Sequence, residues 1–446
     1  MLGDIFFFKK LLRLLFIGSI VVGCSRSVEG PGKRAVSIQK TAKGYRLIRN
    51  GVPFLIKGAG GDIRYLKELQ QAGANTIRIY DTLHLQSKLD KVQKVGMVAV
   101  VDIPIPRYDS QNDHFYTNKD KVTDHANIIK AFIEKYKDHP AVLYWILGNE
   151  IQYPELKGNK NFVSAFNQFV QCIHDTDQNH PVSTAVAGLS RKRIISISQR
   201  SKKLDFISIN LFGQLSSLKK RINSIRLFWN GPYVISEWGV NGPWEAEKTK
   251  WNSPIEQTST KKAELYGARY QEFIAPLTTG KCMGDLAFYC GQKQETTQTW
   301  FSVFTENGNK TELVSTLESI WTNTPNKPWG PKINYLLVND KGSNESLVVE
   351  AKQNMKAKLI SNHLSTSQNR ITWDVKPEGW FYYKWKNQQK LPSQFAMEHT
   401  NSSILTFSAP EEPGPYRLFV SLQNQKGEAA TTNFPFYVLK PEANNE

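Results

Sequence analysis

The stretch AVLYWILGNE, residues 141–150, is an apolar run that ends abruptly in Gly-Asn-Glu. A second stretch, GPYVISEWG at residues 231–239, ends a similar apolar run with Glu237. Short continuous apolar runs are typical of strands in a parallel sheet, because helices cover both faces of such a sheet. The two stretches therefore predict buried parallel strands that present Glu150 and Glu237 at their C-terminal ends.

Similar apolar segments recur on both sides of these two stretches, and segments with apolar residues at helical spacing separate them. The order predicts eight strand–helix units in roughly 270 residues, which is the size of a TIM barrel. We therefore expect an α/β fold, a (β/α)8 TIM barrel, over residues 46–325. The predicted strands lie within residues 52–61, 75–81, 97–104, 141–150, 180–188, 204–213, 232–239 and 283–291.

The pattern changes after the barrel segment. The stretch TNTPNKPWGP, residues 322–331, is rich in proline and polar residues, and it predicts a linker at 326–331. Short apolar segments separated by turn residues then continue to residue 440. This spacing is typical of a smaller all-β sandwich of the immunoglobulin-like kind, which we expect over residues 332–446.

The N-terminal stretch MLGDIFFFKKLLRLLFIGSIVVGC has basic residues followed by an apolar run, which is the layout of a signal peptide. The pair Gly23-Cys24 resembles a bacterial lipobox, which implies cleavage before Cys24 and attachment of lipid to it. The sequence thus predicts a lipoprotein signal peptide at 1–23, a tether at 24–45, and a lipid-anchored protein of the bacterial cell envelope. Ser25 favours the outer membrane. An uncleaved membrane anchor is the alternative.

The net charge of +17 suits an anionic glycan or membrane surface, but we expect the Lys and Arg side chains to form a solvated surface instead. No nucleic-acid motif is recognisable, and the export signal argues against a nucleic-acid partner. Three cysteines follow Cys24, and two of them lie too far apart on one predicted strand to form a disulfide. We expect Cys172, Cys282 and Cys290 to be packed thiols, and we predict no metal site and no cofactor.

The two glutamates are the candidates for catalysis. The C-terminal strand ends of a TIM barrel share one rim, so Glu150 and Glu237 are expected to face each other there. Glycoside hydrolysis needs two carboxyl groups around the sugar bond, one protonated to assist the leaving oxygen and one ionised. The pair therefore predicts a glycoside hydrolase that acts on a polysaccharide or oligosaccharide.

The motifs GNE and SEWG, in this order of eight units, resemble the catalytic pattern of clan A glycoside hydrolases. Residues 238–266 and 291–304 are similar to the family 2-type TIM-barrel catalytic domain of bacterial lipoproteins, and the resemblance covers about residues 50–325. It implies a retaining double displacement, with Glu150 as general acid/base and Glu237 as nucleophile. NTIRIYD, residues 75–81, resembles β-1,3-glucan-active barrels and implies a β-linked glucan as substrate.

The resemblance also implies roles for residues near the pair. Asn149 is expected to hydrogen-bond the sugar 2-hydroxyl, and Arg78 is expected to lie near Glu237 and keep it ionised. The alternatives are a turn-capping role for Asn149 and a structural ion pair for Arg78. Asp102, at the end of the third strand, is either a substrate contact or a buried hydrogen-bonding group.

Aromatic residues that follow the strands are candidates for stacking on a sugar face. Three tryptophans follow the seventh strand, and we expect one of them to contact substrate. The candidates are Trp238, Trp244 and Trp251, with Tyr108 after the third strand as a weaker one.

Two positions depart from the family pattern. Phe212 stands where strand six often has a tyrosine near the nucleophile, and Cys290 stands where a tryptophan often precedes the motif GQKQE. Tyr289 is then the candidate for the aromatic floor under the sugar. Three alternatives stay open: a non-catalytic glycan-binding surface lipoprotein on a degenerate barrel, a transglycosylase, and a structural adhesin.

Overall fold

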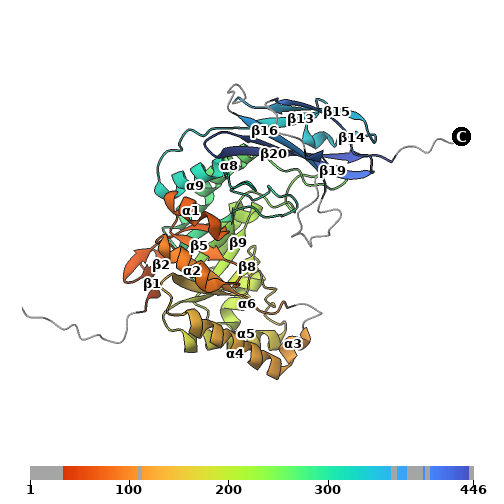
Figure 1. Ribbon diagram of the computed structural model, residues 1–446. Helices are drawn as coiled ribbons and strands as arrows, with labels where there is room; N and C mark the ends of the chain where they lie inside the picture. Colours follow the sequence, from red (N-terminus) through yellow and green to blue (C-terminus); the bar gives the residue numbers. More distant parts are fainter. Residues whose placement is uncertain (1–33, 109–112, 363–368, 379–394, 397–401, 441–446) are drawn as a thin grey trace, which may run out of the picture. The chain divides into compact units, whose positions relative to one another are not determined.

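The computed structural model describes residues 34–108, 113–362, 369–378, 395–396 and 402–440 (Figure 1). Eight parallel strands close into a barrel in the order β10-β11-β4-β5-β6-β7-β8-β9, which confirms the predicted TIM barrel. The barrel strands are β4 (Ile56–Gly61), β5 (Thr76–Ile79), β6 (Val98–Ile103), β7 (Val142–Leu147), β8 (Val182–Ala187), β9 (Phe206–Leu211), β10 (Tyr233–Trp238) and β11 (Cys282–Cys290).

Helices follow the barrel strands along the chain. Several of them begin at a side chain that accepts a hydrogen bond from a free backbone N–H, such as Asn118 before α4, Asn159 before α5 and Thr258 before α8. The helices are α1 (Leu66–Gln71), α2 (Leu85–Lys94), α3 (Asp113–Thr117), α4 (Lys119–Tyr136), α5 (Lys160–Thr176), α6 (Arg191–Arg200), α7 (Leu218–Ser224), α8 (Ser259–Arg269) and α9 (Glu312–Thr322).

The two strands that carry the glutamates are buried along their whole length. All six residues of β7 and all six of β10 are buried, as expected for strands between a filled barrel and its helices. Trp145 on β7 satisfies its indole nitrogen by donating to Asp177 Oδ2 at 2.8 Å. The chain therefore reaches the solvent-facing rim only at the polar residues that follow β7.

The segment expected to be a tether is partly a small sheet. Strands β1 (Val36–Thr41), β2 (Gly44–Arg49) and β3 (Val52–Phe54) form an antiparallel sheet in the order β1-β2-β3. The single strand predicted at 52–61 is divided between β3 and β4. Pro53 has no N–H to donate, which suits the edge position of β3 better than the interior of the barrel.

Two further sheets share one apolar core in the C-terminal part. One has the order β12-β20-β19-β16-β17, with β14 also paired to β20, and the other has the order β13-β15-β18. The immunoglobulin-like topology stays a prediction. The strands are β12 (Lys310–Thr311), β13 (Tyr335–Val338), β14 (Val348–Val349), β15 (Asn354–Ile360), β16 (Arg370–Pro377), β17 (Phe395–Ala396), β18 (Ile404–Ser408), β19 (Gly414–Gln423) and β20 (Glu428–Val438).

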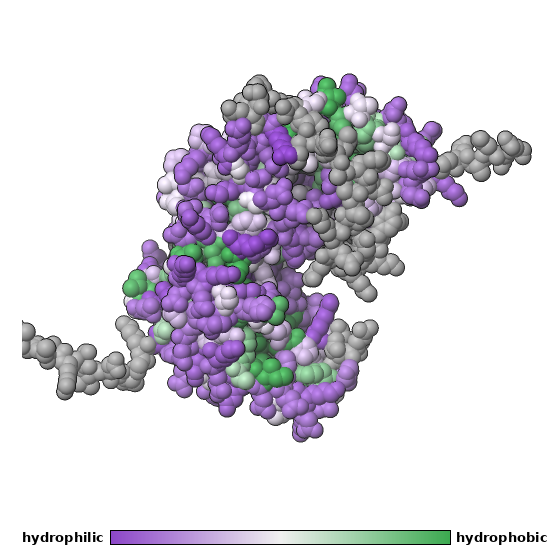
Figure 2. Space-filling view, in the orientation of Figure 1, coloured by the Kyte–Doolittle hydropathy of each residue, from purple (hydrophilic) through white to green (hydrophobic). Residues whose placement is uncertain are grey.

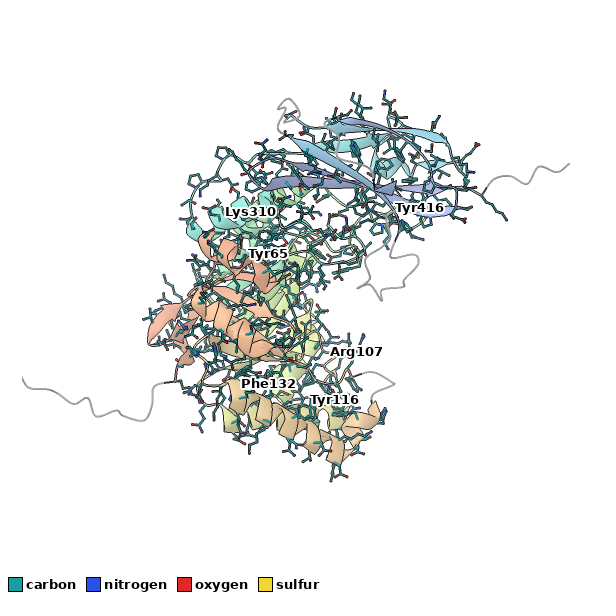
Figure 3. All side chains as sticks on the ribbon, viewed as in Figure 1. Tyr65, Arg107, Tyr116, Phe132, Lys310 and Tyr416 are labelled. Atoms are coloured by element: carbon teal, nitrogen blue, oxygen red, sulfur yellow. The ribbon has the colours of Figure 1, made fainter. Side chains whose placement is uncertain are left out.

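Strand β12 crosses the predicted division between barrel and sandwich. It precedes α9 in the chain, yet Lys310 and Thr311 pair with β20 (Figure 3). The predicted linker at 326–331 lies between the end of α9 at Thr322 and the start of β13 at Tyr335. The sandwich sheet therefore includes residues that come before that linker.

Predictions about the N-terminus fall outside the described residues, including the signal peptide at 1–23 and lipidation at Cys24. In the described part, no helix has the length and apolar character needed to cross a membrane. Cys172, Cys282 and Cys290 are free thiols, as predicted. The face of the molecule in Figure 2 is mostly hydrophilic, in keeping with the many Lys and Arg side chains.

A buried ionic network joins the barrel to the sandwich. Arg417 on β19 donates from Nε to Glu378 Oε1 at 2.9 Å and from Nη2 to Ser253 Oγ at 2.8 Å. Ser253 belongs to the segment between β10 and α8, and its hydroxyl donates to Glu378 Oε1 at 2.6 Å. All three residues are almost fully buried, so each charge depends on the others for solvation.

We expect Arg417→Ala to destabilise the protein by about 3–5 kcal/mol, because it leaves the Glu378 carboxylate buried without its cation. Thermal or urea unfolding followed by circular dichroism measures the loss. Arg370→Ala, on exposed Arg370 of β16, is the matched control and should change stability little. Equal midpoints for the two variants would contradict this account of the network.

Candidate active site

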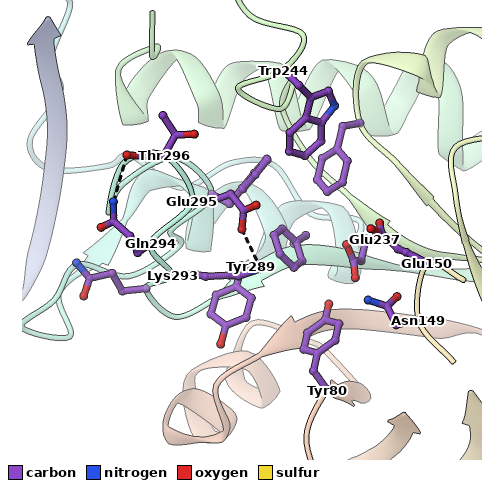
Figure 4. A pocket seen from close by; sticks show the side chains of 14 residues that line it. Tyr80, Asn149, Glu150, Glu237, Trp244, Tyr289, Lys293, Gln294, Glu295 and Thr296 are labelled. Atoms are coloured by element: carbon purple, nitrogen blue, oxygen red, sulfur yellow. Dashed lines mark hydrogen bonds and ion pairs between the residues drawn. The ribbon is translucent and has the colours of Figure 1, made fainter. Parts of the chain in front are cut away.

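A cavity of about 910 Å³ opens at the C-terminal ends of the barrel strands (Figure 4). Its walls come from β10 and β11 and from the segments that follow β5, β7, β9, β10 and β11. The lining residues are Tyr80, Asn149, Glu150, Phe212, Glu237, Trp244, Phe288, Tyr289, Gln292, Lys293, Gln294, Glu295, Thr296 and Phe301.

Both predicted catalytic glutamates line this cavity. Glu150 follows β7 in a left-handed backbone conformation, with φ of 52°, and its side chain is exposed to solvent. Glu237 lies on β10 and is only 5% exposed. Figure 4 shows the two side chains next to each other, and Asn210 on β9 donates to Glu150 Oε1 at 3.1 Å. Closure of the barrel therefore brings together two carboxyl groups that are distant in sequence.

Arg78 on β5 holds the inner side of the site. Its guanidinium is fully buried and makes a bidentate pair with Asp102, with Nε–Oδ1 at 2.9 Å and Nη2–Oδ2 at 2.8 Å. It also donates to Glu237 Oε1 at 2.9 Å and to Asn149 Oδ1 at 2.7 Å. The predicted proximity of Arg78 to Glu237 is confirmed, and Arg78 acts through other side chains because it does not line the cavity.

Burial raises the pKa of Glu237 to about 8 even though Arg78 opposes the shift, and the neighbouring Glu150 also raises it. Asp102 makes a smaller contribution in the same direction, and Lys293 opposes it. Arg78 favours the ionised form of Glu237, in the direction that we expected, but burial has the larger effect on its pKa.

Asn149 has its amide orientation fixed by two donors. Its Oδ1 accepts from Arg78 Nη2 and from Asn210 Nδ2, the latter at 3.1 Å. The carbonyl side is thus directed into the network, and Nδ2 is the group that faces the cavity in Figure 4. This geometry makes Asn149 a hydrogen-bond donor for a bound molecule.

Three residues predicted to contact substrate lie elsewhere. Trp238 is fully buried and donates from Nε1 to Asp285 Oδ1 at 2.7 Å, because side chains alternate along β10 and Glu237 takes the inner side. Asp102 is buried beneath Arg78, so its role as a hydrogen-bonding group is the correct alternative. Tyr108 packs against Phe162 and against Tyr116, which is labelled in Figure 3.

Two predicted aromatic candidates do line the cavity. Trp244 is 50% exposed, and its ring meets Phe212 edge-on at a centroid distance of 5.6 Å. Tyr289 lies across the cavity, next to Phe288. Cys290 is fully buried and does not reach the cavity, so Phe288 and Tyr289 supply the aromatic surface at the end of β11. Trp251 instead packs on Tyr437 of β20.

Tyr80 is a site residue that our sequence reasoning missed. It lies two positions after Arg78 in the stretch RIYD, so strand alternation places both on the same side, and this signal was available. Burial and the Glu237 carboxylate raise the pKa of Tyr80 well above its ordinary value. The phenol that faces Glu237 is therefore that of Tyr80, directly after β5. Phe212, on the segment after β9, has no hydroxyl group that could take this place.

Gly60 on β4 makes room for that phenol. A Cβ atom at Gly60 would lie 2.1 Å from the Tyr80 hydroxyl oxygen, which is far inside van der Waals contact. The Tyr80 ring also stacks on the Arg78 guanidinium, with 4.6 Å between Cζ and the ring centroid. Asn210, Phe288, Lys293 and Glu295 are further site residues that we did not predict.

No protein-family model matches the chain. Curated proteins with similar segments include a β-glucuronidase of Paenibacillus borealis, 28% identical over 141 residues that cover 27% of this chain and 23% of that protein. Mannan endo-1,4-β-mannosidase F of Aspergillus clavatus is 31% identical over 99 residues, covering 21% of this chain and 20% of the relative. Mannan endo-1,4-β-mannosidase 3 of Arabidopsis thaliana is 29% identical over 112 residues, covering 23% and 26%. The chain thus matches only about a quarter of each relative.

Two solved structures resemble the fold. The β-glucuronidase of an uncultured Clostridium species has a TM-score of 0.51 at 16% identity, covering 65% of this chain and 54% of that chain. The β-D-glucuronidase of Dictyoglomus thermophilum has a TM-score of 0.50 at 17% identity, with the same coverage. These likenesses concern the fold. The curated proteins with similar segments are glycoside hydrolases, and the chain itself is a TIM-barrel protein with a sandwich attached.

Glu237→Gln should make the free energy of unfolding less sensitive to pH. The folded-state pKa of Glu237, about 8, is above its ordinary value of 4.5, so unfolding releases a proton between these pH values. The wild type therefore loses up to about 1.4 kcal/mol per pH unit from this group as the pH rises through that window, and the variant does not. We expect the melting temperature of the variant, relative to wild type, to increase from pH 5 to pH 8 and then level off.

Differential scanning fluorimetry across pH 5–9 measures this difference. Glu264→Gln, which changes an exposed carboxylate on α8, is the control and should give a nearly constant offset. A pH-independent offset for Glu237→Gln as well would show that Glu237 titrates normally.

Proposed function

We propose that the chain is a retaining glycoside hydrolase that cleaves a β-linked glucan or a related extracellular polysaccharide. The observation that carries this proposal is the pair Glu150 and Glu237 in one cavity at the strand ends, with Arg78 bonded to one of them. Glycosidase relatives support the reaction class. A β-1,3-glucan is the first candidate substrate, and it rests on the resemblance of residues 75–81.

The mechanism assigns one role to each glutamate. Glu237 attacks the anomeric carbon while the glycosidic C–O bond breaks, and Glu150 gives its proton to the leaving oxygen. Glu150 then takes a proton from water, whose oxygen attacks the anomeric carbon and releases Glu237. The mechanism needs Glu237 ionised for the attack. The Arg78 guanidinium lowers the pKa of Glu237 and so favours that form, against burial, which raises it.

The surroundings of the pair suit a sugar. Asn149 directs its Nδ2 into the cavity, where it can donate to the sugar 2-hydroxyl. Trp244 offers a partly exposed ring on the opposite wall. The intact network around Arg78, which bonds to both Glu237 and Asn149 beside Glu150, favours a catalytic barrel over a degenerate one.

Transfer of the glycosyl group to a sugar acceptor instead of water uses the same steps, so a transglycosylase is the alternative function. We also propose that lipid at Cys24 anchors the protein in the bacterial cell envelope, at the outer membrane. This part of the proposal rests on the sequence alone. Such an anchor would keep the enzyme close to extracellular polysaccharides.

Wild-type protein should release reducing ends from at least one member of a panel of β-linked polysaccharides, and Glu237→Ala should lose at least about 1,000-fold of that activity. Reducing-sugar assays and chromatography of the products measure both. Glu264→Ala, far from the cavity, is the control and should keep full activity. If wild type and Glu237→Ala both bind a polysaccharide and neither cleaves it, the protein is a glycan-binding protein and not a hydrolase.

Glu150→Ala should retain the first step on a substrate with an activated leaving group such as 2,4-dinitrophenolate, since this group needs little help from an acid. A burst of released phenolate in stopped-flow measurements, followed by slow turnover, is the expected result. Added azide should speed the second step, because it needs no general base. If Glu150→Ala abolishes the burst and Glu237→Ala retains it, the two roles are reversed, as the raised pKa of Glu237 would then explain.

A further inference from the structure

Carboxyl groups outnumber cationic groups among the described residues that line the cavity. Among the described lining residues, the carboxyl groups of Glu150, Glu237 and Glu295 face a single ammonium group, that of Lys293. Lys293 Nζ lies 2.9 Å from Glu295 Oε2, as the dashed line in Figure 4 shows. The same ammonium lies 4.9 Å from the centroid of the Phe288 ring. Its charge is thus already engaged by two neighbours.

The other cation of the site is out of reach. Arg78 is fully buried, and its guanidinium is occupied by Asp102, Glu237 and Asn149. A ligand would have to displace one of these partners to bond to it. Displacement would leave a buried carboxylate without its cation, which is strongly unfavourable.

We propose that the cavity selects uncharged sugar units and rejects uronides, the sugars whose C6 is a carboxylate. This inference rests on the proposed function and narrows its substrate class. A uronate group that entered the cavity would approach Glu150 and Glu237 with no free cation among the described lining residues. Repulsion between like charges in a partly desolvated site strongly disfavours binding.

The rest of the lining suits a neutral sugar. The side-chain amides of Gln292 and Gln294 on the segment after β11 offer donors and acceptors for sugar hydroxyls. Phe212, Phe288 and Phe301 form an aromatic cluster with centroid distances from 5.0 to 5.7 Å, and they present apolar surface for the sugar ring. Hydrogen bonds and stacking of this kind need no charge on the ligand.

Sequence likeness does not decide this question, because the similar segments belong to proteins named for a uronide and for a neutral mannan. The pair of Lys293 and Glu295 does decide it. Glu295 neutralises Lys293, the one cation among the described residues that line the cavity, so it acts as a specificity-determining residue without touching the reacting atoms.

The test uses matched polysaccharides that differ only at C6. β-1,3-Glucan, β-1,4-glucan and β-1,4-mannan are each compared with the same polymer oxidised to the C6 carboxylate, at low salt. We expect kcat/KM for the cleaved neutral polymer to exceed that of its oxidised form by at least about 100-fold. Equal or faster cleavage of an oxidised polymer would overturn the inference while leaving the proposed hydrolase in place.

A binding experiment tests the inference even if no polymer is cleaved. Calorimetry measures the binding of short neutral and oxidised oligomers to Glu237→Gln. Binding of the neutral oligomers alone would sustain the inference even if no polymer is cleaved, and it would then be the proposed hydrolase that fails. Binding of the oxidised oligomers, or of neither form, would overturn the inference.

Glu295→Gln tests whether the substrate preference shifts in the expected direction. It frees Lys293, so kcat/KM for the oxidised polymer should rise relative to the neutral one by about 10-fold or more, and high salt should reduce the gain. Glu264→Gln removes the partner of Lys261 on α8, at 2.7 Å and far from the cavity, and it should leave the ratio unchanged. An unchanged ratio in Glu295→Gln would show that Glu295 sets no preference.

Discussion

The fully buried guanidinium of Arg78 is the constraint on which the site depends. A cation without access to water is tolerated only when its N–H groups all have acceptors. Arg78 finds them on β6, β9, β10 and the turn after β7, through Asp102, Asn210, Ser236, Glu237 and Asn149. These bonds therefore fix the positions of the strand ends, and the strand ends fix the positions of Glu150 and Glu237.

The same constraint gives the two glutamates different environments. Glu237 is enclosed, and the loss of hydration raises its pKa more than the ion pair with Arg78 lowers it. Glu150 stands in solvent at the rim and takes a single hydrogen bond from Asn210. A pair that differs in burial can divide the tasks of acid and nucleophile, which two equivalent carboxylates could not do.

The sequence was sufficient for the barrel and for the glutamate pair, because apolar runs with polar ends leave few alternative arrangements. It was insufficient for the surrounding side chains. Trp238 ends β10 and Trp244 follows it, yet the first packs behind the barrel wall and the second faces the cavity. Local sequence shows that a residue is near a strand end, but the side of the wall depends on the local register, which shifts between Ile235 and Glu237. The alternation of side chains along a strand would have been enough to place Tyr80 on the same side as Arg78. The pairing of Lys293 with Glu295 could be seen only from the conformation of the loop.

The sandwich takes part in shaping the cavity. Glu256, between β10 and α8, accepts hydrogen bonds from Thr297 of the cavity-lining segment and from Asn433 of β20, and it pairs with Lys262. Lys262 also donates to the Thr299 carbonyl at 2.8 Å, and β12 continues the sandwich sheet from the end of the same segment. Residues 292–296 are therefore held between a barrel strand on one side and bonds that reach the sandwich on the other. A sandwich that served only as a spacer would need no buried carboxylate at this junction, so its contacts belong to the architecture of the site.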